Sequence, residues 1–363
     1  MATQVTNYQC PNCTGPLHFV GESGQLECDY CGTKYEVNII EELYADKEKA
    51  AAAAAENKMD WDMSAAGGEW SDEEAAHMRA YSCPSCGAQI ICDETTAATS
   101  CLYCGNPTVI PGQFNAQLKP DYVIPFKLDK KAALQALQAY YKGKKFLPKS
   151  FADKNHVEEI KGVYVPFWLF DGKADANIRF TATKVNSYTQ GDYRVTETDH
   201  YRVVREGSIA FEKVPVDGSS KMPDAHMDAV EPFEYSELKP FSSAYLPGYF
   251  ADKYDIDSTT CSERANERIR LSTERAFAAT AAGYATLKPE HSLINLKKGN
   301  IKYAFMPVWL LSTKWQENTY LFAMNGQTGK LIGDLPIDKG RYWAWFGAIF
   351  ASLALILAAL LFI

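Results

Sequence analysis

The chain lacks the sequence motifs that mark several common catalytic sites. Its 363 residues contain no H-E-x-x-H, no G-x-S-x-G and no Walker A sequence. These absences exclude the recognisable forms of zinc metalloproteases, α/β-hydrolases and P-loop nucleotide-binding proteins. The six histidines are scattered, and their positions do not have the spacing of metal ligands. We therefore expect no catalytic residue, no organic cofactor and no enzymatic activity.

Cysteine is nearly absent from most of the chain. Nine of the ten cysteines lie in the first 104 residues, and the remaining one is Cys261. Paired C-x2-C units at a fixed spacing indicate metal-bound thiolates rather than a disulfide framework. The first ten residues also lack the apolar segment of a secretory signal. We therefore expect the thiols to stay reduced in the cytosol.

The clustered cysteines form two equal units. Each reads C-x2-C-x14-C-x2-C, and the second follows the first at a constant offset of 73 residues. Four thiolates surround one tetrahedral ion and leave no open position for water, so such sites are structural. The sequence predicts two small zinc ribbons, residues 1–40 and 79–112, that together bind two Zn²⁺ ions. The expected ligands are Cys10, Cys13, Cys28 and Cys31 in the first ribbon, and Cys83, Cys86, Cys101 and Cys104 in the second.

Cys92 is the surplus thiol of the second unit. On the 73-residue offset it corresponds to Phe19, and a position that phenylalanine fills is a packing position. The same alignment pairs Tyr30 with Tyr103. His18 lies inside the first unit, but four cysteines already complete the ligand set there.

Positive charge is missing from both units. No Lys or Arg lies between Cys10 and Cys31 or between Cys83 and Cys104, whereas both stretches contain acidic residues. Proteins bind nucleic acids through Lys and Arg side chains that neutralise phosphates. With a formal net charge of −8, the chain favours a protein partner over nucleic acid.

Charge is also missing from residues 342–363. As a helix these 22 residues would be about 33 Å long, enough to cross the bilayer core. Tyr342 and Trp343 would lie at one membrane interface, and the preceding Lys339 and Arg341 favour the cytoplasmic side for that end. We expect a single-pass tail anchor in the cell membrane, with the bulk of the protein in the cytoplasm. The alternative is a buried core helix.

The sequence of residues 41–78 predicts a linker between the two ribbons. The alanine-rich stretch 41–58 favours a helix that has no apolar face to dock on a core. An acidic, glycine-containing loop follows, and Ser71 is expected to cap a short helix. We expect Trp61 and Trp70 to pack back on the second ribbon; a short docking motif is the alternative.

The sequence of residues 118–336 predicts an α+β domain built from two related halves. The motif YVPFWL at 164–169 matches FMPVWL at 305–310, and each copy is expected after a helix and before a hairpin. Asp171-Gly172 is expected to form the first hairpin turn. The helices are expected at 130–142, capped by Asp129, and at about 258–279. The two Pro-x-Trp tryptophans either anchor a sheet or line a ligand pocket.

An acidic cluster precedes the second of these helices. Asp252, Asp255 and Asp257 lie within six residues. We expect a solvated loop and a helix cap there rather than a metal site.

Several segments resemble one bacterial family over nearly the whole chain. They include DETTAATSCLYCGNP, LKPDYVIPFKL, GVYVPFWLFD, VPVDGSSKM and EPFEYSELKPFSSAYLPGYFADKYD. With the two ribbons and the apolar end, the chain resembles the YdjG-like membrane proteins with zinc ribbons of the transcription-factor-IIB (TFIIB) type. The resemblance implies a link to membrane-stress operons that also encode phage-shock and SPFH-domain proteins. It implies an adaptor that recruits an SPFH-domain protein to the membrane, and it supplies no catalytic residue.

The sequence therefore predicts a multidomain, non-enzymatic adaptor that the bilayer holds through residues 342–363. Its cytosolic head presents zinc ribbons to a protein partner. The first alternative is a membrane-tethered nucleic-acid-binding protein of replication or transcription. The second is an enzyme with a pocket beside Trp168 and Trp309, which would need a titratable pair of side chains.

Overall fold

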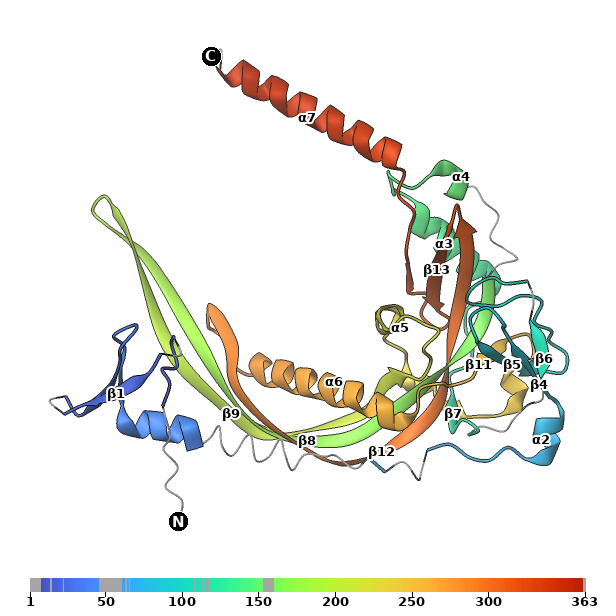
Figure 1. Ribbon diagram of the computed structural model, residues 1–363, viewed down its shortest axis with the longest axis horizontal. Coiled ribbons are helices and arrows are strands. Elements are labelled where there is room, and N and C mark those ends of the chain that lie inside the picture. Colours follow the sequence, from blue (N-terminus) through green and yellow to red (C-terminus); the bar gives the residue numbers. More distant parts are fainter. Residues whose placement is uncertain are drawn as a thin grey trace. The chain divides into compact units, whose positions relative to one another are not determined.

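The protein is described here from a computed structural model (Figure 1). The structure describes residues 8–13, 15–21, 23–45, 61–62, 64, 66–107, 109–112, 114, 118–152 and 160–361. Contacts divide the chain into two units. The first unit comprises Met1–Asp60, Lys173–Ala210 and Arg270–Lys298, and the second comprises Trp61–Gly172, Phe211–Ile269 and Gly299–Ile363.

The first unit begins with a small antiparallel sheet, in the order β1-β2-β3 (Figure 1). Its strands are β1 (Leu17–Val20), β2 (Gln25–Cys28) and β3 (Lys34–Glu36). A helix over residues 37–45 follows directly and contributes Ile40 and Leu43 to the interior. Of the expected 41–58 helix, residues 41–45 are helical, and residues 46–60 lie outside the described part of the chain.

The rest of the first unit is formed by parts of four long elements: β8 (Ile160–Gln190), β9 (Tyr193–Asp217), α6 (Ser258–Ala279) and β12 (Thr286–Trp315). Inward-facing side chains alternate along β8, so Ala176, Ile178 and Phe180 are all buried. They pack with Val203 of β9 and with Phe277 of α6. This alternation gives the unit a second, separate apolar cluster.

The second unit contains most of a mixed sheet, in which 11 described strands are connected. The strands run in the order β10-β7-β12-β8-β11-β5-β4-β6, with β9 beside β8 and β13 and β14 beside β12. The shorter members are β4 (Met78–Ser82), β5 (Gln89–Asp93), β6 (Ile110–Gly112), β7 (Tyr122–Val123), β10 (Lys239–Pro240), β11 (Phe250–Asp252), β13 (Asn318–Asn325) and β14 (Leu331–Gly333). The strands β4, β5 and β6 come from the second cysteine unit, which therefore shares a sheet with the predicted α+β domain.

Helices of the second unit begin where capping residues predict. In α2 (Asp72–Ala76), Ser71 and Glu74 form a capping box. In α3 (Lys130–Tyr141), Asp129 accepts a hydrogen bond from the Ala132 backbone N–H. The helix α6 has the expected bounds. The remaining helices are α4 (Lys149–Ala152), α5 (Asp224–Val230) and α7 (Lys339–Leu361).

The two Pro-x-Trp motifs lie on β8 and β12 and make matching contacts. The Trp168 indole N–H donates to the Ile256 carbonyl at 3.0 Å, and Trp309 donates to the Leu128 carbonyl, also at 3.0 Å. Each acceptor precedes the aspartate that caps the other half's helix. Each motif strand also pairs in parallel with the short strand before that helix. These matching contacts are what a repeated strand–helix–hairpin unit would produce.

The hairpin turn expected at Asp171-Gly172 is wrong, because β8 runs without interruption from Ile160 to Gln190. The Asp171 carboxylate instead accepts a hydrogen bond from the Lys213 backbone N–H, at a point where Lys213 has a positive φ of 56°. Gly299 of β12 lies so close that a Cβ there would collide with the Asp171 carbonyl oxygen. The Asp-Gly pair therefore serves a close approach between strands, and the chain turns later, at Gly191.

Both linker tryptophans pack, but mainly against elements outside the second ribbon. Trp61 lies edge-to-face on Phe170 of β8 and donates to the Asn266 side chain of α6. Trp70 packs between Phe114 and Phe241. Packing on the second ribbon was expected for both, and the residues around the tryptophans do not indicate these other partners.

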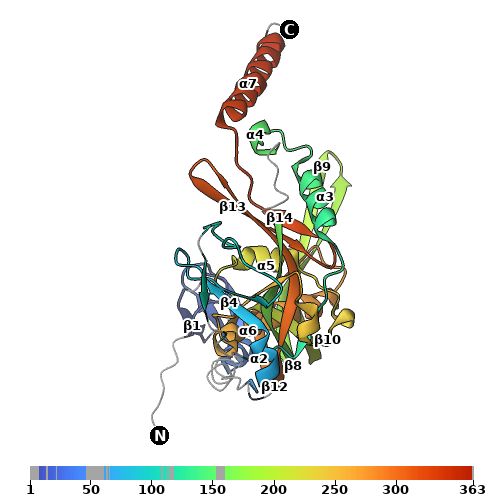
Figure 2. The same ribbon diagram turned by 90° about the vertical axis from the view of Figure 1, so that its right-hand side faces the viewer.

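The helix α7 is long and apolar enough to cross a membrane, over Lys339–Ala358. None of this segment is buried within the protein, which speaks against the alternative of a core helix. Its first turn contacts the loop before α4, and the two elements lie near each other in Figures 1 and 2.

Candidate metal centres

The same backbone turns build both cysteine units. The Cys10 N–H donates to the Gly15 carbonyl at 2.7 Å, and its counterpart Cys83 donates to Ala88 at 2.9 Å. In the second C-x2-C turn of each unit, the glycine after the last ligand adopts a positive φ, 68° at Gly32 and 66° at Gly105. These turns hold two sulfurs on one side of each site.

In the first centre, four sulfurs converge from the two turns. The Sγ atoms of Cys10 and Cys31 are 3.6 Å apart, and those of Cys13 and Cys28 are 3.4 Å apart. Cys10 and Cys28 are buried, whereas Cys31 is exposed. The Asn12 backbone N–H lies 3.4 Å from the Cys10 sulfur, in position to donate to a thiolate.

The second centre repeats this geometry. The Sγ atoms of Cys83 and Cys104 are 3.6 Å apart, and those of Cys86 and Cys101 are 3.5 Å apart. In each group, all four sulfurs lie within 4.8 Å of one another. The structure therefore brings together the two ligand sets that the spacing predicts.

The donor atoms fit a tetrahedral metal ion in both centres. Metal–sulfur bonds of about 2.3 Å in a tetrahedron place the sulfurs about 3.8 Å apart, close to the observed separations. A disulfide would need about 2.05 Å, and none of the ten cysteines, all of which the structure describes, forms a disulfide. Each group could hold one metal ion through four thiolates, without a position for substrate or water.

The two spare cysteines, Cys92 and Cys261, lie outside both ligand groups and are buried. Burial raises the pKa of Cys92 to about 11 and that of Cys261 to about 12, so both stay protonated. The Cys92 thiol donates to the Thr96 carbonyl at 3.0 Å, as expected for a packing residue. His18 also lies outside its group, 2.8 Å from Asp29.

The surroundings of the two centres are different. In the first, Phe19 is 58 % exposed and Tyr30 is 77 % exposed. Their counterparts in the second, Cys92 and Tyr103, are buried in the main core of the second unit. Ser312 of β12 also donates to the Tyr103 carbonyl. One face of the ribbon is thus solvent-exposed in one copy and covered in the other.

The acidic cluster predicted as solvated contains one buried member. Asp257 caps α6 through the Thr260 N–H, as expected, and Asp255 accepts from Ser220. Asp252, however, is 1 % exposed and accepts from the Ser219 hydroxyl. Burial raises its pKa to about 7. This burial was not predictable from neighbouring residues, because it results from the pairing of β11 with β5 and β8.

A cavity of about 200 Å³ opens between this acidic loop and the second ribbon. Asp252 lines it together with Gln89 and Lys221. The Gln89 side of the cavity is formed by β5, the ribbon strand that pairs with β11 of the large sheet.

The pocket beside the Pro-x-Trp tryptophans is small and apolar. Trp309 lines a cavity of about 10 Å³ with Leu137, Phe322 and other apolar side chains. Trp168 is buried and its indole N–H is hydrogen-bonded. Both tryptophans therefore anchor the sheet, which is the first of the two roles considered for them.

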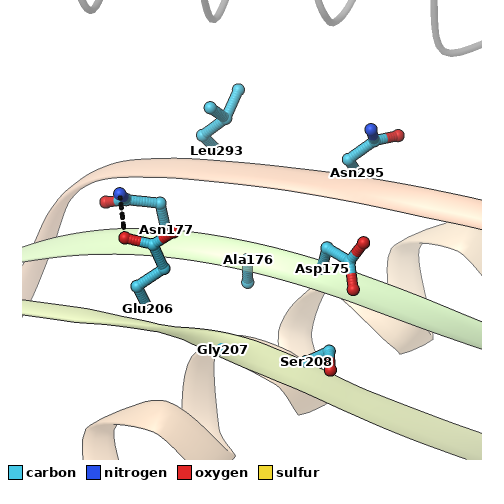
Figure 3. A pocket seen from close by; sticks show the side chains of 8 residues that line it. All are labelled: Asp175, Ala176, Asn177, Glu206, Gly207, Ser208, Leu293 and Asn295. Atoms are coloured by element: carbon cyan, nitrogen blue, oxygen red, sulfur yellow. Dashed lines mark hydrogen bonds between the residues drawn. The ribbon is translucent and has the colours of Figure 1, made fainter.

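A wider groove of about 400 Å³ crosses β8, β9 and β12 within the first unit (Figure 3). The Asn177 amide points toward Glu206 and donates to it at 3.4 Å (Figure 3). Asp175 at the same groove is paired with Lys297. The residues that line it include neither histidine nor cysteine.

Comparison with known proteins shows one full-length relative. The "Uncharacterized protein YdjG" of Bacillus subtilis (strain 168) is 35 % identical over 345 residues, which cover 95 % of this chain and 94 % of that protein. No protein-family model matches the chain. No solved structure matches it either.

Proposed function

The chain belongs to the YdjG family, and from that premise we propose that it is a membrane-anchored, zinc-binding adaptor. In this proposal, two Zn²⁺ ions stabilise its cytoplasmic head, α7 holds the head at the cell membrane, and the first ribbon docks a protein partner. The partner that the resemblance suggests is an SPFH-domain protein of a membrane-stress system. Nothing in the proposal requires catalysis.

Zinc is the metal that the donor sets favour. Four thiolates in a tetrahedron suit Zn²⁺ better than hard cations such as Mg²⁺ or Ca²⁺, which prefer oxygen. A zinc ion bound by four cysteines acts as a cross-link and lends its binding free energy to a small fold. Metal analysis of protein purified without added metal is expected to give two zinc ions per chain.

The observation that carries the adaptor proposal is the different burial of one ribbon face. The second ribbon covers Cys92 and Tyr103 by packing on its own chain. The first ribbon leaves the counterparts Phe19 and Tyr30 exposed. Exposed aromatic side chains are common in the centres of protein interfaces. The second ribbon is covered by other residues of its own chain. A partner bound to the first ribbon would cover the corresponding face from another chain.

The test is capture of a purified SPFH-domain protein by the full-length protein in detergent. We expect Phe19→Ser with Tyr30→Ser to abolish capture, because both substitutions remove exposed aromatic area without touching a ligand. Tyr193→Ser is the matched control, since Tyr193 is 78 % exposed but lies on β9. Zinc content should stay at two ions in all variants. Equal capture by the double variant and the control would contradict the docking role of this face.

The nucleic-acid alternative has no specific observation in its favour. The cation nearest the first centre in sequence, Lys34, lies 3.3 Å from Glu27 and is paired with it. Sub-micromolar binding of DNA with a steep dependence on salt would nevertheless favour nucleic-acid binding over the adaptor function, because such a slope measures phosphate neutralisation.

A further inference from the structure

A lysine-rich loop far away in the sequence docks on the first turn of α7. This loop, residues 142–149, runs from the end of α3 to the first residue of α4 and reads KGKKFLPK. Its Phe146 carbonyl accepts from the Asp338 N–H at 2.8 Å, and its Leu147 carbonyl accepts from the Arg341 side chain at 3.1 Å. These bonds fix the loop at the base of the candidate membrane span, although about 190 residues separate the two in sequence.

Aromatic contacts set the height of the loop along α7. The rings of Phe146 and Tyr342 lie edge-to-face with centroids 5.7 Å apart. One turn further along, the Lys145 ammonium lies 4.6 Å from the centre of the Trp345 ring. Tyr and Trp at the start of a membrane span lie at the level of the lipid headgroups. The loop therefore lies at headgroup level once α7 is in a bilayer.

The charge at this level is strongly positive. Lys142, Lys144, Lys145 and Lys149 are exposed, and no carboxylate within the described residues pairs with any of them. Lys339 and Arg341 of α7 bring the number of cationic side chains to six, and the one acidic group among residues 142–149 and 338–342 is Asp338, which contacts Arg341. Clusters of four to eight such residues beside a membrane span attract anionic lipids.

We propose that the 142–149 loop and the first turn of α7 form a binding site for the phosphates of anionic phospholipids. The inference rests on the membrane anchoring in the proposed function, and it adds the lipid class. The occupant is a lipid rather than an acidic protein, because the lysines surround the segment that enters the bilayer. Lipid binding there would also fix the orientation of the head above the membrane.

The experiment measures lipids that stay bound to the full-length protein in mild detergent, by native mass spectrometry. Phosphatidylglycerol and phosphatidylcholine with the same acyl chains are offered in equal amounts. We expect phosphatidylglycerol to be retained about tenfold more, since each lysine adds favourable charge interaction. The triple variant Lys142→Gln, Lys144→Gln and Lys145→Gln should lose this preference. The matched control is Lys127→Gln, Lys239→Gln and Lys330→Gln, which neutralises three exposed lysines on other loops and strands and should keep it.

Two outcomes would overturn the inference. One is equal retention of the two lipids by the unaltered protein. The other is full competition by soluble glycerol phosphate, which would indicate a site for a free phosphate rather than a lipid surface. Zinc content and thermal unfolding of the triple variant serve as folding controls. Flotation with phosphatidylcholine vesicles tests anchoring by α7 separately. If the unaltered protein does not float with these vesicles, the proposed anchor is refuted instead.

Discussion

The two candidate metal centres have the same cysteine spacing and the same turns, yet their sulfurs lie in different structural surroundings. The first centre is attached to three short strands and one helix, and one of its ligands, Cys31, is exposed. In the second, the ribbon strand β5 pairs with β11 of the large sheet, and Leu102 and Tyr103 join the main core. One four-cysteine motif can thus either hold together a small module or attach a segment to a larger domain.

The largest expected difference concerns the loss of one ligand. Cys28→Ser and Cys101→Ser should each lower the metal content from two ions to one. Structural zinc contributes about 10–16 kcal/mol to small ribbons, so Cys28→Ser should unfold the first ribbon and leave the melting of the large sheet unchanged. Cys101→Ser should destabilise the sheet by about 3 kcal/mol or more, because part of the metal-binding free energy stabilises the core that this ribbon shares. Calorimetry and limited proteolysis measure both. Equal effects on the main transition would contradict the comparison.

We expect a pH-dependent stability of intermediate size only in the part of the protein that contains the second centre. Burial raises the pKa of Asp252 from 3.8 to about 7. A raised folded-state pKa stabilises the fold below the unfolded pKa, and this stability is lost as pH rises through the folded pKa. Between pH 6 and 8 the loss should be about 1.4 kcal/mol. Asp252→Asn should reduce the slope by this amount in denaturant titrations at several pH values.

Ser219→Ala provides the second arm of that test. The Ser219 hydroxyl lowers the pKa of Asp252, so its removal should move the loss of stability to higher pH. No buried carboxylate occurs among the described residues of the first ribbon. An unchanged slope in Asp252→Asn would show that this carboxyl does not titrate in the fold.

The smallest expected effect compares the aligned positions Cys92 and Phe19. Cys92→Ala should cost about 1–2 kcal/mol, because it leaves a small cavity in a packed core. Phe19→Ala should change stability by less than about 0.5 kcal/mol, because the ring is largely exposed. Both variants should keep two metal ions. Thermal unfolding with metal analysis measures this, and loss of metal from Cys92→Ala would make that thiol a ligand after all.

Features set by nearby residues were predictable from the sequence. The eight ligand positions follow from a spacing within 22 residues, and Ser71 and Asp129 cap helices that begin at the next residue. The bounds of α6 also follow from a local pattern of Cys261, Ala265 and Ile269, all of which are buried on one face.

Features set by distant residues were not predictable. The Asp171-Gly172 pair is a turn signal on its own, but Lys213 and Gly299 determine that the strand continues. The 31-residue length of β8 exceeds the usual range of strands. The pairing of β5 with β11 joins residues about 160 positions apart, and the alignment of the two ribbons contains no sign of it. The burial of Tyr103 and Asp252 depends on that pairing.

The reciprocal indole bonds of Trp168 and Trp309 have a consequence for how the α+β region can be assembled. Each tryptophan donates to a carbonyl of the opposite half, one residue before the aspartate that caps the helix of that half. Cutting the chain between β9 and β11 would give two fragments that both lack a structural partner. Such fragments should remain incompletely folded alone and regain native structure when mixed, because each half supplies a hydrogen-bond donor that the other lacks.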